Sequence, residues 1–121
     1  MPSSSVDVCA IMVAYHGVDS LRKALAALDG VDIVVIDNSA DVEVRAAAQE
    51  AGAQYVDSGG NLGFAPAVNL GIAHAGGRDI VLVNPDAEVS AQTVRAMVKR
   101  MRTPGSRVAA VAPSLTQPDG R

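Results

Sequence analysis

Aromatic side chains are scarce in this sequence of 121 residues, which has no tryptophan, two tyrosines and one phenylalanine. Proteins that bind single-stranded nucleic acid usually stack bases on several aromatic rings, so this composition argues against that class. The chain also lacks an excess of positive charge, because 10 basic residues stand against 13 acidic ones, for a net charge of −3. A surface built to bind nucleic-acid phosphates needs the opposite balance, so we expect no nucleic-acid partner.

Cysteine and long apolar runs are also nearly absent. Cys9 is the only cysteine, which excludes an internal disulfide and a zinc site made of cysteines. No apolar run approaches the roughly 20 residues of a membrane-spanning helix, and residues 1–5 (MPSSS) lack the features of a signal peptide. We therefore expect no transmembrane segment, and a location in the cytoplasm or at the inner face of its membrane.

Short apolar runs recur along the chain, and most of them end in a polar cluster. Runs that are apolar on both faces are typical of parallel strands covered on both sides. Four of them are strong strand candidates and one, Gln54–Asp57, is weaker. The four strong candidates are Val8–Ala14, Ile33–Ile36, Ile80–Val83 and Val108–Ala112.

Helical patterns with plausible caps separate these runs. Capping residues, first-turn proline and terminal glycines mark where each helix begins and ends. The alternation predicts an α/β fold: a Rossmann-like, mainly parallel sheet with helices on both faces, in one domain over residues 1–121. The predicted markers are Asp19 and Gly30 for the first helix, Asp41 and Gly52 for the second, Pro66 and His74 for the third, and Ser90 and Pro104 for the fourth.

Polar residues gather where the predicted strands end. Ligands of open parallel sheets bind beyond the carboxyl ends of the strands, so these clusters are the candidate site. The clusters are Tyr15-His16-Gly17, Asp37-Asn38-Ser39, the glycine-containing segment 58–64 and residues 84–88.

Two aspartates of these clusters each admit two interpretations. Asp37 is suited to accept hydrogen bonds from a ribose hydroxyl or a base N–H, or it is an ordinary turn residue. Asp86 is suited to a divalent metal bound to a diphosphate, or it starts a turn before the fourth helix. Glu88 is either a second carboxylate or a favourable charge at that helix. We expect Asp37 and Asp86 to lie exposed at one edge of the sheet and to face one cleft.

The segment Gly59–Gly63 matches neither of the common phosphate-binding glycine motifs. Its backbone N–H groups are placed before a helix start, where they can meet an anion, and the alternative is a loop with glycines at positive φ. His16 is either a ligand contact or a solvated loop histidine.

Taken together, the segments resemble the amino-terminal half of an inverting, nucleotide-sugar-dependent glycosyltransferase with the GT-A fold, in the group that includes bacterial rhamnosyltransferases. The resemblance covers about residues 7–120, and the twelve-residue segment 61–72 (NLGFAPAVNLGI) is its most specific part. The other matching segments are residues 13–15 (VAY), 35–39 (VIDNS) and 82–87 (LVNPDA).

The resemblance implies a binding site for a sugar donor. Two positions depart from the family pattern: Asn84 stands where an aspartate is usual, and His16 stands where many relatives have asparagine. The implied metal ligand is Asp86, which would hold Mg²⁺ or Mn²⁺. The implied nucleotide contacts are Ala14, Tyr15, Asp37, Asn61, Asn69 and Asn84.

The resemblance also implies the reaction. The donor would be a nucleotide-diphosphate-sugar such as TDP-rhamnose or a UDP-hexose, and the acceptor a glycan or polyprenyl-linked molecule of cell-wall or polysaccharide synthesis. The catalytic base of such enzymes lies in their later half, so we expect it beyond Arg121, no catalytic residue within this chain, and no transfer by these residues alone.

Other functions remain open on the sequence. The main alternative is a non-catalytic nucleotide-binding or regulatory α/β domain, since a fold does not fix a function. A phospho-receiver would need acidic residues where Tyr15 and His16 stand, and a nucleotidyltransferase would need a glycine- and arginine-rich loop there. An exposed sheet edge would favour pairing between copies of the chain, so a homo-oligomer is a further expectation.

Overall fold

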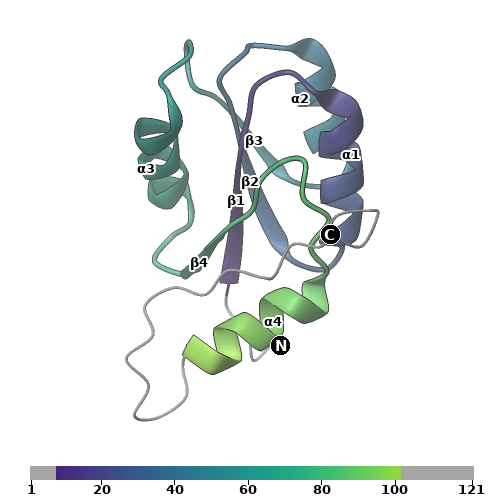
Figure 1. Cartoon of the computed structure of the whole chain (residues 1–121). Coiled ribbons are helices and arrows are strands. Elements are labelled where there is room, and N and C mark those ends of the chain that lie inside the picture. The colour runs from purple at the N-terminus through teal and green to yellow at the C-terminus, as the bar shows by residue number, and fades with distance from the viewer. Residues whose placement is uncertain (1–7, 102–121) are drawn as a thin grey trace, which may run out of the picture.

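The computed structural model describes residues 8–101, in which four strands alternate with four helices (Figure 1). This confirms the predicted α/β fold, whereas the predicted strand at Val108–Ala112 lies outside the described residues. None of the described helices is long and apolar enough to cross a membrane. In chain order the elements are β1 (Val8–Ala14), α1 (Val18–Ala27), β2 (Asp32–Asp37), α2 (Val42–Glu50), β3 (Gln54–Asp57), α3 (Phe64–His74), β4 (Asp79–Leu82) and α4 (Ala91–Met101).

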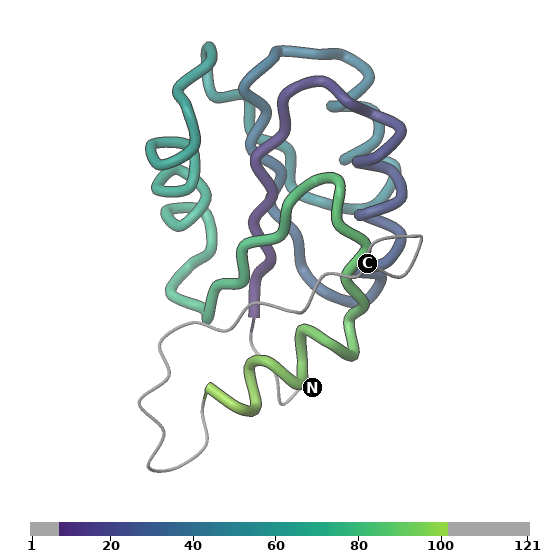
Figure 2. Tube along the Cα trace, viewed as in Figure 1, coloured from purple at the N-terminus to yellow at the C-terminus, as the bar shows by residue number. Residues whose placement is uncertain are grey.

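The strands form one sheet in the order β3-β2-β1-β4, and every neighbouring pair is parallel. The chain first builds outward from β1 through β2 to β3 and then returns to the other side of β1 as β4, a path that can be followed in Figure 2. The carboxyl ends of β1, β2 and β3 are level, because Ala14 is paired with Asp37 and Asp37 with Asp57.

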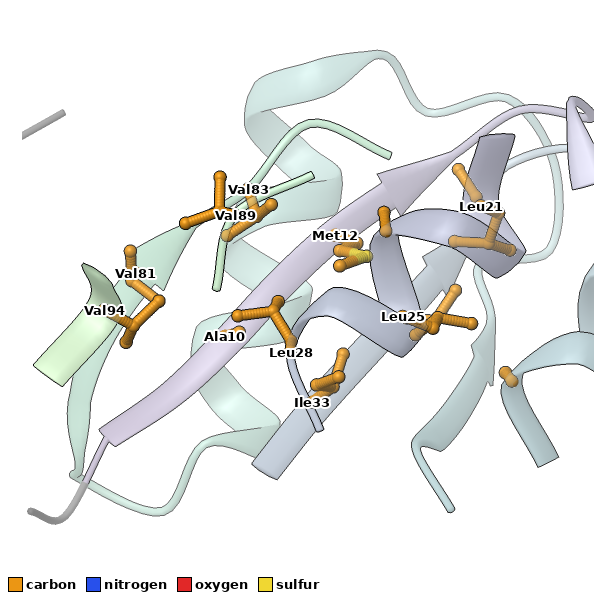
Figure 3. Packing of buried hydrophobic residues seen from close by; sticks show 14 of the residues in the cluster. Ala10, Met12, Leu21, Leu25, Leu28, Ile33, Val81, Val83, Val89 and Val94 are labelled. Atoms are coloured by element: carbon orange, nitrogen blue, oxygen red, sulfur yellow. The ribbon is translucent and has the colours of Figure 1, made fainter. Parts of the chain in front are cut away.

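Helices cover both faces of the sheet, as the doubly apolar strands predict. On one face, leucines of α1 pack over Met12 and Ala10 of β1 (Figure 3), and residues of α2 and α4 belong to the same cluster. On the other face, α3 packs against β1 and β2, where Ile11 and Ile36 are buried. Alternate residues of β1 thus belong to separate apolar clusters, and this strand is buried from both sides.

Two of the three predicted capping residues are confirmed. Asp41 Oδ1 accepts a hydrogen bond from the Glu43 N–H at the start of α2, and Ser90 Oγ accepts one from the Thr93 N–H at the start of α4. Asp19 is not a cap: α1 begins at Val18, and Gly17, with φ of 68°, occupies the capping position. The cause is a left-handed turn after β1 that starts the helix two residues earlier than a cap at Asp19 would.

Helix α3 approaches β1 closely at Gly71. A Cβ atom at this position would lie 2.7 Å from Cγ2 of Ile11, a side chain that is itself almost fully buried. Real Cβ atoms do not come this near to a neighbour, so glycine is what permits the helix to lie at its present distance from the sheet.

We predict that Gly71→Ala lowers stability although alanine is the better helix former. The overlap with Ile11 should cost about 1–3 kcal/mol, more than the roughly 1 kcal/mol gained from helix propensity. The matched control is the reverse exchange at an exposed site of the same helix, Ala73→Gly, which should also lower the melting temperature. If Gly71→Ala instead raises the melting temperature measured by circular dichroism, the close approach is not as described.

Candidate functional site

The carboxyl edge of the sheet is where the topology places a binding site. The order of the strands reverses between β1 and β4, because the chain leaves β1 on one side and returns on the other. In open α/β sheets the loops that follow two such strands diverge to opposite faces and leave a crevice between them. Tyr15 follows β1. Asn84 follows Val83, the residue just beyond β4, whose N–H donates to the Ile11 carbonyl.

A small pocket lies at this reversal point. Its volume is about 80 Å³, and it opens between β1, the end of β4 and the first residue of α3. Phe64 and Leu82 at its margin are 60% and 47% exposed, unusual for side chains of this size. The pocket is lined by Ile11, Val13, Phe64, Leu82, Val83, Asn84 and Pro85.

Asp37 closes β2 with a carboxylate that is fully buried and fully hydrogen-bonded. Its Oδ1 accepts from the Ser39 N–H at 2.8 Å and from Ser39 Oγ at 2.6 Å. Its Oδ2 accepts from the Asp41 N–H at 3.0 Å and from the Tyr55 hydroxyl at 2.7 Å. A carboxylate offers about four acceptor positions, so protein donors occupy all those of Asp37.

The electrostatics of this cluster follow from its burial and its hydrogen bonds. Burial alone would raise the pKa of Asp37, but the hydrogen bonds from Ser39, Tyr55 and Asp41 outweigh it and hold that pKa below its ordinary value. Burial, the hydrogen bond to Asp37 and the negative charge of that carboxylate raise the pKa of the Tyr55 hydroxyl. Asp37 therefore stays a charged acceptor and the Tyr55 hydroxyl a neutral donor.

The expectation that Asp37 is exposed is wrong. Asp37 and Asp86 both follow the carboxyl ends of parallel strands, as predicted, but only Asp86 is exposed. Asp37 bonds to Tyr55, which packs against the cluster beneath α1 and α2, whereas the pocket lies on the α3 side. The start of α2 lies close to this carboxylate, because the N–H of its capping residue Asp41 donates to Asp37.

Asn38 is a buried polar residue whose role the sequence did not reveal. Its Nδ2 donates to the Gly63 carbonyl at 3.1 Å, and its Oδ1 accepts from Ser58 Oγ at 2.8 Å. Ser58 and Gly63 are the two ends of the glycine-containing loop, so one amide fixes the loop that leads into α3. An asparagine next to a strand-end aspartate was the available signal, but turn chemistry explained it equally well.

His16 has partners in the fold, contrary to the simple picture of a solvated loop histidine. Its backbone N–H donates to Ser39 Oγ at 3.0 Å, and its Nδ1 lies 2.9 Å from Asp41 Oδ2. The hydrogen bond from His16 is the main cause that lowers the pKa of Asp41. The imidazole edge also meets the ring of Tyr15, with 4.7 Å between ring centroids.

The remaining predicted site residues lie at or near the same edge, with different exposure. Ala14 is buried at the end of β1, while the Tyr15 side chain is 60% exposed. Asn61 is exposed and its Oδ1 accepts from the Gly63 N–H. The other exposed candidates are Asn69 on α3 and Asn84, Asp86 and Glu88 between β4 and α4.

Comparison with known proteins assigns the chain to a family. Residues 9–120 match the sequence profile of Glycosyl transferase family 2. The chain belongs to this family. The parallel sheet with helices on both faces agrees with a family 2 domain.

One curated family relative can be compared over a long stretch. The chain is 30% identical over 94 residues to the low-salt glycan biosynthesis hexosyltransferase Agl10 of Haloferax volcanii. The match covers 74% of this chain but 31% of the relative, so the chain spans about a third of the length of that protein.

We predict that Asp37→Ala strongly destabilises this family 2 chain. Removing the carboxylate leaves buried donors from Ser39, Asp41 and Tyr55 without an acceptor, which should cost about 2–4 kcal/mol. The melting temperature should fall by about 10 °C or more. The control Asp57→Ala removes an exposed strand-end carboxylate that accepts one hydrogen bond, from the Gly59 N–H, and should change stability far less. Equal effects of the two changes would contradict the buried network.

The same carboxylate should make stability depend on acidity. Because the pKa of Asp37 is lower in the folded chain than its unfolded value of about 3.9, its contribution is complete above that value. It is lost as the pH falls through the folded value. The free energy of unfolding measured with urea should therefore fall more steeply below about pH 4 for the wild type than for Asp37→Asn. Parallel pH profiles for the two proteins would show that Asp37 is not the linked group.

Proposed function

We propose that this chain is the donor-binding part of a glycosyltransferase that takes a sugar from a nucleotide-diphosphate-sugar. The observation that carries the proposal is the pocket between β1 and β4, at the strand-order reversal of a family 2 chain. Tyr15 and Asn84 follow the two strands that flank it. The activity of the relative, hexosyl transfer in glycan synthesis, supports transfer of a hexose. As donor we propose a UDP-hexose or TDP-rhamnose, and as acceptor a glycan or polyprenyl-linked molecule.

The nucleoside is proposed to bind at the ends of β1 and β2. The Tyr15 ring is exposed and offers a face on which a base can stack, and Ala14 beside it is small enough to let the ligand approach the strand. The proposed nucleoside role of Asp37 requires that a base N–H or ribose hydroxyl replace one of its present donors. The amides of Asn61, Asn69 and Asn84 are the remaining proposed polar contacts.

The diphosphate is proposed to lie near the start of α3. The first N–H groups of a helix have no partner within it, and the positive end of the helix dipole favours an anion. Gly63 precedes the helix at φ of 81°, and Phe64, its first residue, lines the pocket. The sugar-diphosphate would accordingly run from Tyr15 toward Phe64 and Asn69.

Asp86 is the proposed metal ligand. Within residues 8–101 no three histidine, cysteine or carboxylate side chains cluster to form a complete site. Asp86 itself is exposed and makes no side-chain hydrogen bond in the described part, so its carboxylate is available. That fits Mg²⁺ or Mn²⁺, which needs only one or two protein carboxylates when phosphates and waters supply the rest. The ion would neutralise charge on the leaving diphosphate.

Three carboxylates of the described edge are already used in holding its loops. Asp37 is buried and saturated, Asp41 caps α2 and pairs with His16, and Asp57 holds the Gly59 N–H. Since the chain spans about a third of its relative, we place the base and the acceptor site outside it. In the proposed inverting reaction, that base takes the proton of the acceptor hydroxyl as it attacks the anomeric carbon and the nucleoside diphosphate leaves.

We predict that the 121-residue chain binds UDP or TDP and that part of the binding needs a divalent metal. A nucleotide at about 100 times its Kd adds roughly 2.7 kcal/mol to the folded state, which should raise the melting temperature by about 10 °C. Asp86→Ala should remove the metal-dependent part of the rise. Because Asp86 is exposed, the melting temperature without nucleotide should stay within about 2 °C of the wild type.

The control is Asp29→Ala, an exposed carboxylate beyond the carboxyl end of α1 that plays no part in the proposed site. Asp29→Ala should leave both the nucleotide and the metal response unchanged. A folded chain that shows no shift with either nucleotide at millimolar concentration would contradict the proposal. A shift that is identical with and without metal would contradict the role of Asp86.

We also predict that the purified chain transfers no sugar from a donor that it binds. The missing general base alone is worth about 10²–10⁴-fold in rate, and the missing acceptor site adds to this loss. Radiolabelled donor and a polyprenyl phosphate or glycan acceptor would measure the product. Robust transfer would place a base within these residues and contradict the assignment of their carboxylates.

A further inference from the structure

His16 joins the two loops at the carboxyl edge through two separate contacts. Its backbone N–H donates to Ser39 Oγ, which donates in turn to Asp37 Oδ1. Its ring bonds to Asp41 Oδ2, and the N–H of Asp41 donates to Asp37 Oδ2. Both contacts lead to the same buried carboxylate, so His16 is fixed in main chain and ring alike.

Tyr15 contrasts with its neighbour. Tyr15 is 60% exposed, and its ring meets the His16 imidazole in a T-shaped arrangement with 4.7 Å between ring centroids. An exposed tyrosine samples several rotamers on a fast timescale unless a neighbour restricts it. The orientation of Tyr15 therefore depends on where the imidazole is held.

We propose that His16 is a positioning residue for the nucleobase: the His16–Asp41 pair holds the imidazole, and the imidazole holds the Tyr15 ring in the orientation that receives the base. The proposal rests on the proposed function, in which Tyr15 contacts the nucleoside. An aromatic ring that is already ordered loses less entropy on binding than a mobile one.

Stability alone does not account for this arrangement. The side chains of His16 and Asp41 are 55% and 20% exposed, and a pair with one partner open to water adds little to folding. His16 also holds a φ of 55°, a left-handed conformation that is uncommon for a residue other than glycine. Asp41 needs only Oδ1 to cap α2, which leaves Oδ2 for the histidine. His16 thus adopts an unfavourable backbone conformation in the position that fixes its ring at the surface.

Two variants separate the pairing from the fold. His16→Gly removes the imidazole at a position where glycine adopts the left-handed conformation freely. Asp41→Ser removes the partner of the imidazole but keeps a side-chain oxygen that caps α2, because serine is as good a cap as aspartate. Both chains should keep the far-ultraviolet circular dichroism spectrum of the wild type.

Calorimetric titration with UDP and TDP tests binding. We expect each variant to raise the nucleotide Kd about fivefold, the scale of one edge-to-face ring contact. We expect Tyr15→Ala to raise it about tenfold or more. Neither His16→Gly nor Asp41→Ser should weaken binding further when Tyr15 is already alanine, since both act through that ring. An undiminished effect in the Tyr15→Ala background would show that His16 touches the ligand directly and would overturn the proposal.

A ligand-free measurement decides the proposal even if no nucleotide binds. The chain has no tryptophan and two tyrosines, so the near-ultraviolet circular dichroism signal of Tyr15 follows from the difference between wild type and Tyr15→Phe. Asp41→Ser should abolish most of that signal, because Asp41 holds the His16 imidazole that meets the Tyr15 ring. An unchanged Tyr15 signal would refute the positioning role. Loss of the signal without nucleotide binding would support the positioning of Tyr15 and refute the donor site instead.

Discussion

The buried carboxylate of Asp37 is the interaction on which the carboxyl edge of the sheet depends. Its four donors come from Ser39 and Asp41 in the loop after β2 and from Tyr55 in β3, and His16 extends the network into the loop after β1. A charge removed from water is tolerated only when hydrogen bonds replace its hydration. The loops must therefore adopt one arrangement, and the same requirement that stabilises Asp37 fixes the shape of the edge.

This network divides the polar residues of the edge into two groups. Asp37 and Asn38 are buried and make their hydrogen bonds within the protein, so they hold loops in place. Tyr15, Asn84 and Asp86 are exposed and leave their polar or aromatic surfaces open. A site that must bind a charged ligand benefits from this division, because rigid loops carry the exposed groups to fixed positions before the ligand arrives.

The sequence predicted the fold well because its signals are local. Apolar runs located all four described strands to within a residue of each bound, and the caps of α2 and α4 followed from Asp41 and Ser90. The predicted cap of α1 was wrong because a left-handed turn at His16 and Gly17 starts the helix before Asp19. The burial of Asp37 was missed because it depends on Tyr55, which lies 18 residues away in the chain, and spacing carries no information about such contacts.

Strand β1 is where the two faces of the molecule constrain each other. On one face its end is held by the loops bound to Asp37, since the Asn38 N–H donates to the Ala14 carbonyl. On the other face Gly71 lets α3 approach until Ile11 fills the remaining space. Phe64, the first residue of that helix, and Val13 of that strand both line the pocket, so the distance between α3 and β1 sets its width. A change that moves α3 away from Ile11 therefore alters the pocket as well as the core, and the packing that makes the chain stable is also what shapes its candidate binding site.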